Sequence, residues 1–114
     1  MYSINRQVAV IKPKKPYIEW INSLSDTDKP FDIESLDKDC TVYLMPDLDD
    51  DEESLEYIKR FHKRIFDFEL DSWFTDKKLW PKKRDFNLFL EWFNIEFHSE
   101  VIDLLEDNIE KEEY

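Results

Sequence analysis

Apolar residues recur at steps of three and four through residues 51–68. This spacing is the period of an amphipathic helix that buries one face. The apolar positions of that face are Leu55, Ile58, Phe61, Ile65 and Phe68. Asp50 and Glu53 have the spacing of a capping box, and acidic residues in a first turn suit the positive end of the helix dipole. The pattern therefore predicts a long, core-forming helix with an acidic start.

Two short apolar runs, residues 6–12 and 40–45, are rich in strand-forming side chains. Pro13 and Pro46 end them, because proline cannot donate a hydrogen bond to a neighbouring strand. We predict a strand over each run.

Residues 17–24 have apolar side chains at helical spacing and follow Pro16, a residue favoured at the first position of a helix. Residues 32–39 are expected to hold one helical turn. Strand, helix and strand in this order suggest a β-α-β unit, which is right-handed if its strands are parallel. In that parallel arrangement, Lys12 would lie near Asp47 at one end of the sheet.

Asp85 precedes residues 86–93, whose apolar positions predict another helix. Residues 95–104 fit two structures. They alternate as in a half-buried strand, and their apolar positions also fit a continuing helix. The strand is preferred because Asn94 is a suitable helix stop and the β-branched and aromatic residues favour strands.

Together these elements predict an α/β (or α+β) fold in one domain spanning residues 1–114. The expected order is β-α-β-α-α-β, with a small three-stranded sheet packed against helices. Hydrophobic residues make up 41% of the chain and aromatic residues 16%, which is enough for a core. Residues 107–114 are expected to form a flexible acidic tail.

The chain has no glycine, which excludes the glycine-dependent sites. It therefore has no P-loop, dinucleotide fingerprint or nucleophile elbow. Asp47-x-Asp49-x-Asp51 begins like a calcium loop, but Glu52 replaces the turn glycine and Ile58 the twelfth-position glutamate. The acidic run is better interpreted as the start of the long helix.

The formal net charge is −12, and the acidity lies in two segments. Residues 47–56 carry seven acidic and no basic side chains, and residues 100–114 carry seven acidic side chains and one lysine. Such a protein has no general attraction to nucleic acid or anionic membranes, so direct binding to either is not expected. An alternative is that the acidic surface mimics nucleic acid.

Cys40 is the one cysteine of the chain, which favours a reducing compartment. The first residues do not resemble a signal peptide, and no apolar run reaches the length of a membrane span. We therefore expect a cytoplasmic protein.

Cys40 with His62 or His98 is a conceivable nucleophile and base, but a small buried side chain is the preferred interpretation of Cys40. No catalytic residue and no cofactor is predicted. No metal site is predicted either, since the cysteine and histidine spacing does not suit zinc.

Glu96, His98 and Glu100 would share one face if their segment is a strand. A carboxylate-imidazole-carboxylate row can bind a metal or transfer a proton. The same row also suits the solvated face of an edge strand.

A basic segment, residues 77–84, surrounds Trp80 and ends at Arg84. It would suit a phosphate contact beside a stacked base or sugar. The alternative is a solvated loop that Trp80 pins to the core. Lys12 is a further candidate binding residue, with ion pairing as its simpler role.

Four motifs resemble a family of short, acidic bacterial proteins to which no activity is assigned. They are Asn5–Pro13, Leu79-Trp80-Pro81, Phe89-x-x-Trp92-Phe93 and His98-Ser99-x-Val101-x-Asp103-Leu104. The resemblance covers most of the chain and implies a bacterial cytoplasmic origin and one complete domain. It implies no functional residue.

Abundant surface charge and aromatic residues, without a catalytic constellation, favour a non-enzymatic interaction or regulatory protein with a protein partner. The rival hypothesis is a small ligand-binding protein or enzyme that uses His98 with Glu96 and Glu100, helped by Arg84 or Lys12. The oligomeric state and the partner are left open.

Overall fold

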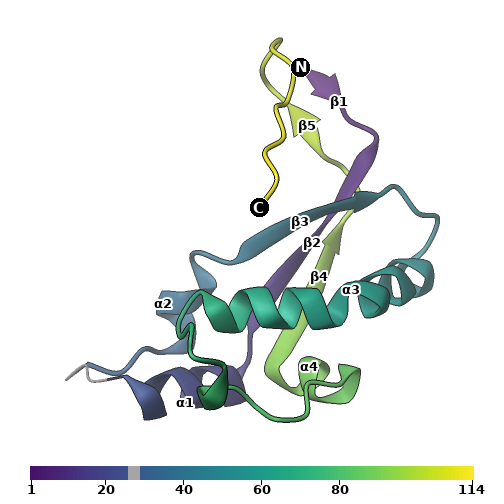
Figure 1. Cartoon of the computed structure of the whole chain (residues 1–114). Helices are drawn as coiled ribbons and strands as arrows, with labels where there is room; N and C mark the ends of the chain where they lie inside the picture. Colours follow the sequence, from purple (N-terminus) through teal and green to yellow (C-terminus); the bar gives the residue numbers. More distant parts are fainter. Residues whose placement is uncertain (26–28) are drawn as a thin grey trace.

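The computed structural model describes residues 1–25 and 29–114, and its centre is a three-stranded sheet (Figure 1). Strand β2 (Arg6–Pro13) lies between β3 (Thr41–Pro46) and β4 (Phe93–His98). The predicted mixture of helices with a small three-stranded sheet is confirmed. The preference for a strand over a helix within residues 95–104 is also confirmed, but the bounds differ, because β4 begins at Phe93 and ends at His98.

Both outer strands run antiparallel to β2, so the parallel arrangement of the first two long strands is wrong. Arg6 pairs with Pro46 and Ile11 with Thr41. Lys12 and Asp47 therefore lie near opposite ends of the sheet. The physical reason is the connection: α1 (Lys15–Leu24) and α2 (Ile33–Asp37) both stay at the end where β2 stops, so the chain re-enters the sheet there (Figure 1).

Helix α3 (Asp51–Asp71) lies across one face of the sheet (Figure 1). It begins as predicted, because the Asp50 side chain accepts a hydrogen bond from the Glu53 backbone at 2.8 Å. The reciprocal bond differs from a capping box: Glu53 accepts from the backbone of Asp49, at 3.2 Å, instead of from Asp50. The start of the long helix is therefore set by local hydrogen bonds.

The buried face of α3 is rotated relative to the predicted one. Leu55 is 37% exposed, whereas Phe66 and Leu70 are fully buried. Phe66 packs in the core against Phe89 and Phe93, with ring centroids 5.7 and 5.5 Å away. These contacts come from helix α4 (Phe86–Trp92) and the start of β4, so the tertiary neighbours of α3 decide which side chains are central.

Side chains of the sheet alternate between a face covered by α3 and a second face that we call the open face. On β2, Gln7, Ala9 and Ile11 are buried toward α3, and the Gln7 side chain donates to Ser54 of α3 at 2.8 Å. The open face carries the alternating residues, several of which are apolar: Val8, Val10, Lys12, Val42, Leu44, Glu96 and His98. Val42 is 54% and Leu44 51% exposed.

The chain ends form a second, two-stranded ribbon that projects from the sheet (Figure 1). Strand β1 (Tyr2–Ser3) pairs antiparallel with β5 (Ile102–Asp103). We call residues 1–5 and 100–109 the terminal arm. Its projection explains a radius of gyration of 15.8 Å, compared with about 13 Å for a compact domain of this length.

Residues 104–114 have no helix or strand, and the flexibility of the acidic tail stays a prediction. The turn predicted within residues 32–39 is α2, capped by Asp32. A short 3-10 helix, η1 (Lys77–Leu79), connects α3 to α4. Across residues 1–25 and 29–114, no helix combines the length and apolarity that crossing a membrane requires.

Candidate functional site

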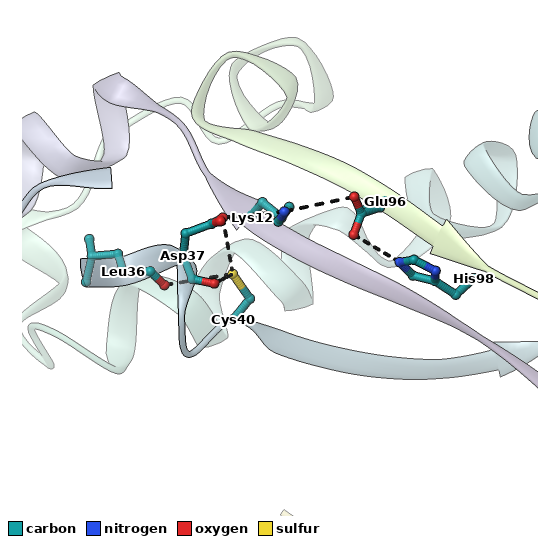
Figure 2. A network of polar contacts seen from close by, with 6 residues as sticks. All are labelled: Lys12, Leu36, Asp37, Cys40, Glu96 and His98. Carbon is teal, nitrogen blue, oxygen red and sulfur yellow. Dashed lines mark hydrogen bonds and ion pairs between the residues drawn. The ribbon is translucent and has the colours of Figure 1, made fainter. Parts of the chain in front are cut away.

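The open face carries a chain of charged contacts that begins at Lys12 (Figure 2). The Lys12 ammonium lies 3.6 Å from a carboxylate oxygen of Asp37 and 3.9 Å from one of Glu96. His98 Nε2 lies 3.0 Å from the other Glu96 oxygen. The hydrogen bond from His98, and then the charge of Lys12, lower the pKa of Glu96. These contacts hold Glu96 as a carboxylate.

The structure brings Glu96 and His98 to one face, as the sequence predicts, because both project from the same side of β4. Glu100 lies two residues beyond the end of β4 and is exposed. The His98 side chain is 55% exposed and the Glu96 side chain 44%. A metal-suited group of three histidine, cysteine, aspartate or glutamate side chains is not found in residues 1–25 and 29–114. This arrangement matches the solvated face of an edge strand.

Trp80 is 6% exposed and pins the basic connector to the core. Its indole N–H donates to the carbonyl of Phe74 at 2.7 Å. Arg84 lies over the ring, 5.5 Å from its centroid, and donates to Asp67 at 3.0 Å. A ring buried in this way has no free face for a base, so the structure matches the pinned-loop interpretation of residues 77–84.

Cys40 has no histidine beside it in the network of Figure 2, where His98 lies beyond Lys12 and Glu96. Its thiol lies 3.3 Å from the carbonyl oxygen of Asp37. Burial, followed by the negative charge of Asp37, raises the pKa of the Cys40 thiol. A thiol in this environment stays protonated and is a poor nucleophile.

A cavity of about 480 Å³ opens between the C-terminal end of α3, helix α1 and the segment that joins α2 to β3. Its lining combines an aromatic wall with hydroxyl groups and two carboxyl groups: Ile11, Pro13, Tyr17, Ser35, Leu36, Asp39, Cys40, Thr41, Glu69, Ser72, Trp73 and Phe93. None of the binding residues proposed from the sequence lines this cavity. We call it the Glu69 cavity.

Glu69 is the charged group most buried in this site, at 9% exposure. The Tyr43 hydroxyl donates to its carboxyl group at 3.0 Å, and the Tyr17 hydroxyl donates to its main-chain carbonyl at 2.7 Å. Burial raises the pKa of Glu69, and hydrogen bonds from Thr41 and Tyr43 partly oppose that rise. Burial and the nearby Glu69 charge also raise the pKa of Tyr17 and of Tyr43. Both phenols therefore remain hydrogen-bond donors.

Sequence reasoning missed Glu69 although one signal was present. Glu69 follows Ile65 by four residues, so it lies on the buried face of the long helix. An ionisable side chain on such a face needs a polar partner or a changed pKa. The partners come from other elements and were invisible in the helix pattern.

Comparison with known proteins found no match among protein-family models, curated proteins or solved structures. A fold by itself does not specify a function. The features of this chain that can indicate its function are therefore the open face, the terminal arm and the Glu69 cavity.

Proposed function

We propose that this chain is a non-enzymatic interaction protein that binds a partner protein through its open face and terminal arm. The main observation in support is the uncovered apolar side of the sheet, where Val42 and Leu44 are about half exposed. The solvated face of an antiparallel sheet ordinarily carries polar side chains. Contiguous exposed apolar surface instead marks sites where proteins associate.

The open face continues into the terminal arm, which supports one extended contact surface. A shallow groove is lined by Leu44 together with Ile4 and residues of the arm and tail, among them Val101, Leu105 and Ile109. Leu105 is 67% exposed and Ile109 58%. A partner that covered this groove would remove apolar area from water, which is the main favourable term in association.

The charge of the chain supports a basic partner. Positions 100–114 carry seven acidic residues and one lysine, and two of these acidic residues, Asp103 and Asp107, line the apolar groove. A partner with an apolar patch and a basic rim would therefore be complementary and would associate faster at low salt. A second copy of this chain, with a net charge of −12, would be repelled.

The test uses the full chain as bait in lysate of the organism that encodes it. Wild type is compared with a Val42→Asp/Leu44→Asp double variant and with Leu79→Asp, whose parent side chain is 40% exposed on η1. We expect one partner in near-stoichiometric yield with wild type and Leu79→Asp. The double variant should lose it, and raised salt should weaken it.

Equal recovery of that partner by the double variant would refute the proposal, as would the absence of a stoichiometric partner. Light scattering on the purified chain provides a further check. A dimer that the double variant dissociates would show that the open face binds a second copy instead. A bacterial cytoplasmic setting, implied by the family resemblance and by the single Cys40, belongs to the same proposal.

A further inference from the structure

We propose that the Glu69 cavity binds a small alkylammonium ion, with the ammonium group on the Glu69 carboxylate and the alkyl chain against the aromatic wall. This inference is independent of the open face, because the cavity lies on the α3 side of the sheet. The volume of about 480 Å³ falls within the range of about 300–1,000 Å³ typical of small-molecule sites.

The charges of the lining favour a cation. Among the described residues of its lining, Glu69 and Asp39 are acidic, and none is lysine, arginine or histidine. Lys12 is directed to the open face, where it contacts Asp37 and Glu96. An anion placed in the cavity would face two carboxyl groups, without a basic side chain among the described residues of the wall.

The position of the cavity at the end of α3 adds a second preference for positive charge. The C-terminal end of a helix carries a partial negative charge, which basic side chains commonly offset. The last turn of α3 has no basic residue and contains two acidic ones, Glu69 and Asp71. A bound ammonium group would provide the missing positive charge.

Glu69 retains hydrogen-bonding capacity for such a ligand. Tyr43 donates to one carboxylate oxygen, and Thr41 donates as well. An ionised carboxylate offers about four acceptor positions, so two donors leave room for an ammonium group. Charge-assisted hydrogen bonds of this type are among the stronger ones.

The remaining wall suits the hydrocarbon part of the ligand. Tyr17, Trp73 and Phe93 line the cavity with Ile11 and Leu36. Aromatic faces attract cations as well as alkyl groups, and the attraction increases when water is excluded. A pocket with an aromatic wall and two acidic groups therefore selects an amine over an amino acid, whose own carboxylate would face Glu69 and Asp39.

The direct test titrates the full chain with n-butylammonium chloride and, separately, with n-butanol as the neutral analogue. Binding is followed by the NMR signals of the Trp73 indole and of the backbone near Cys40. We expect saturable shifts with the amine and affinity at least about tenfold weaker with the alcohol. Titration with Nα-acetyl-lysine methylamide distinguishes a free amine from a lysine side chain as the source of the ammonium group.

Two variants assign the effect to Glu69. Glu69→Gln keeps the shape and the Tyr43 hydrogen bond and should weaken amine binding by about tenfold or more. Glu91→Gln removes the same charge from an exposed position of α4 and should change it by less than about twofold. Equal affinity of n-butanol and the amine, or an unchanged affinity in Glu69→Gln, would overturn the proposal, as would an absence of saturable shifts.

Proton release provides an independent readout on the wild-type protein. The titratable groups that face Glu69 are Tyr17 from α1, Tyr43 and Cys40 from the β3 segment, and Asp39 at the cavity wall. Because burial favours the neutral carboxyl group, binding of a cation should ionise Glu69 and release a proton. Calorimetry in two buffers of different ionisation enthalpy measures that release, and a value of zero near pH 4.5, the ordinary pKa that burial raises for Glu69, would contradict ionisation of Glu69 by the ligand.

Discussion

Replacing Glu69 by glutamine is expected to stabilise the protein at neutral pH and to change how its stability depends on pH. Glu69 is buried against α1 and β3, and burial raises the pKa of its carboxyl group above the ordinary value of 4.5. Glutamine has nearly the same shape and keeps an acceptor for the Tyr43 hydroxyl. The substitution therefore removes the ionisable group while keeping the packing.

The sign follows from proton binding. Between the unfolded and the folded pKa of Glu69, the folded protein binds more protons than the unfolded chain. The contribution of Glu69 to stability is present in full below its unfolded pKa and is lost as the pH rises through its folded pKa. Within that window the slope is at most about 1.4 kcal/mol per pH unit, because one proton is involved.

The assay is urea unfolding of wild type and Glu69→Gln, followed by the fluorescence of the four tryptophans, at several values between about pH 4 and about pH 8. The difference in free energy of unfolding should increase with pH and then level off, in favour of the variant. Taking the difference between the two proteins cancels the contributions of the other carboxylates. Asp85 is one of these: the hydrogen bond from the Leu88 backbone lowers its pKa, so its contribution to stability changes with pH in the opposite direction. Glu91→Gln should show no such increase. Parallel stability curves for wild type and Glu69→Gln across this range would refute the reasoning that burial raises the pKa of Glu69 in the folded protein.

Further predictions concern the core, the helix start and the open face. Phe66→Ala should lower the free energy of unfolding by about 3–5 kcal/mol, since a fully buried ring is lost, whereas Leu79→Ala should cost less than about 1 kcal/mol; urea unfolding compares them. Asp50→Ala should cost about 1 kcal/mol by removing the α3 cap, and Asp50→Asn, which keeps an acceptor oxygen, should restore most of it in the same assay. His98→Ala should raise the pKa of Glu96 toward its ordinary value, because the largest cause of its depression is removed. An unchanged side-chain carboxyl titration in NMR would contradict that assignment.

The candidate sites show which features could be predicted from the sequence and which could not. Glu96 and His98 were found because strand alternation is local and places both on one side of β4. The role of Trp80 remained open in the sequence, since a basic aromatic segment suits either a core or a ligand. Glu69 was missed because its partners Tyr43 and Tyr17 are 26 and 52 residues away in the chain.

The sequence alone determined the elements whose causes are local. Helical periodicity and the Asp50 side chain set the long helix, and Pro13 and Pro46 close the two predicted strands. Tertiary structure decided the direction of the strands, because the route from Pro13 back to Thr41 depends on where two short helices pack. It also decided that one side of the sheet stays open and that Glu69 is buried. Those properties depend on contacts between segments that are distant in the chain. Hydrophobic burial drives such contacts, but it is non-directional, so the sequence pattern does not show which segments will meet.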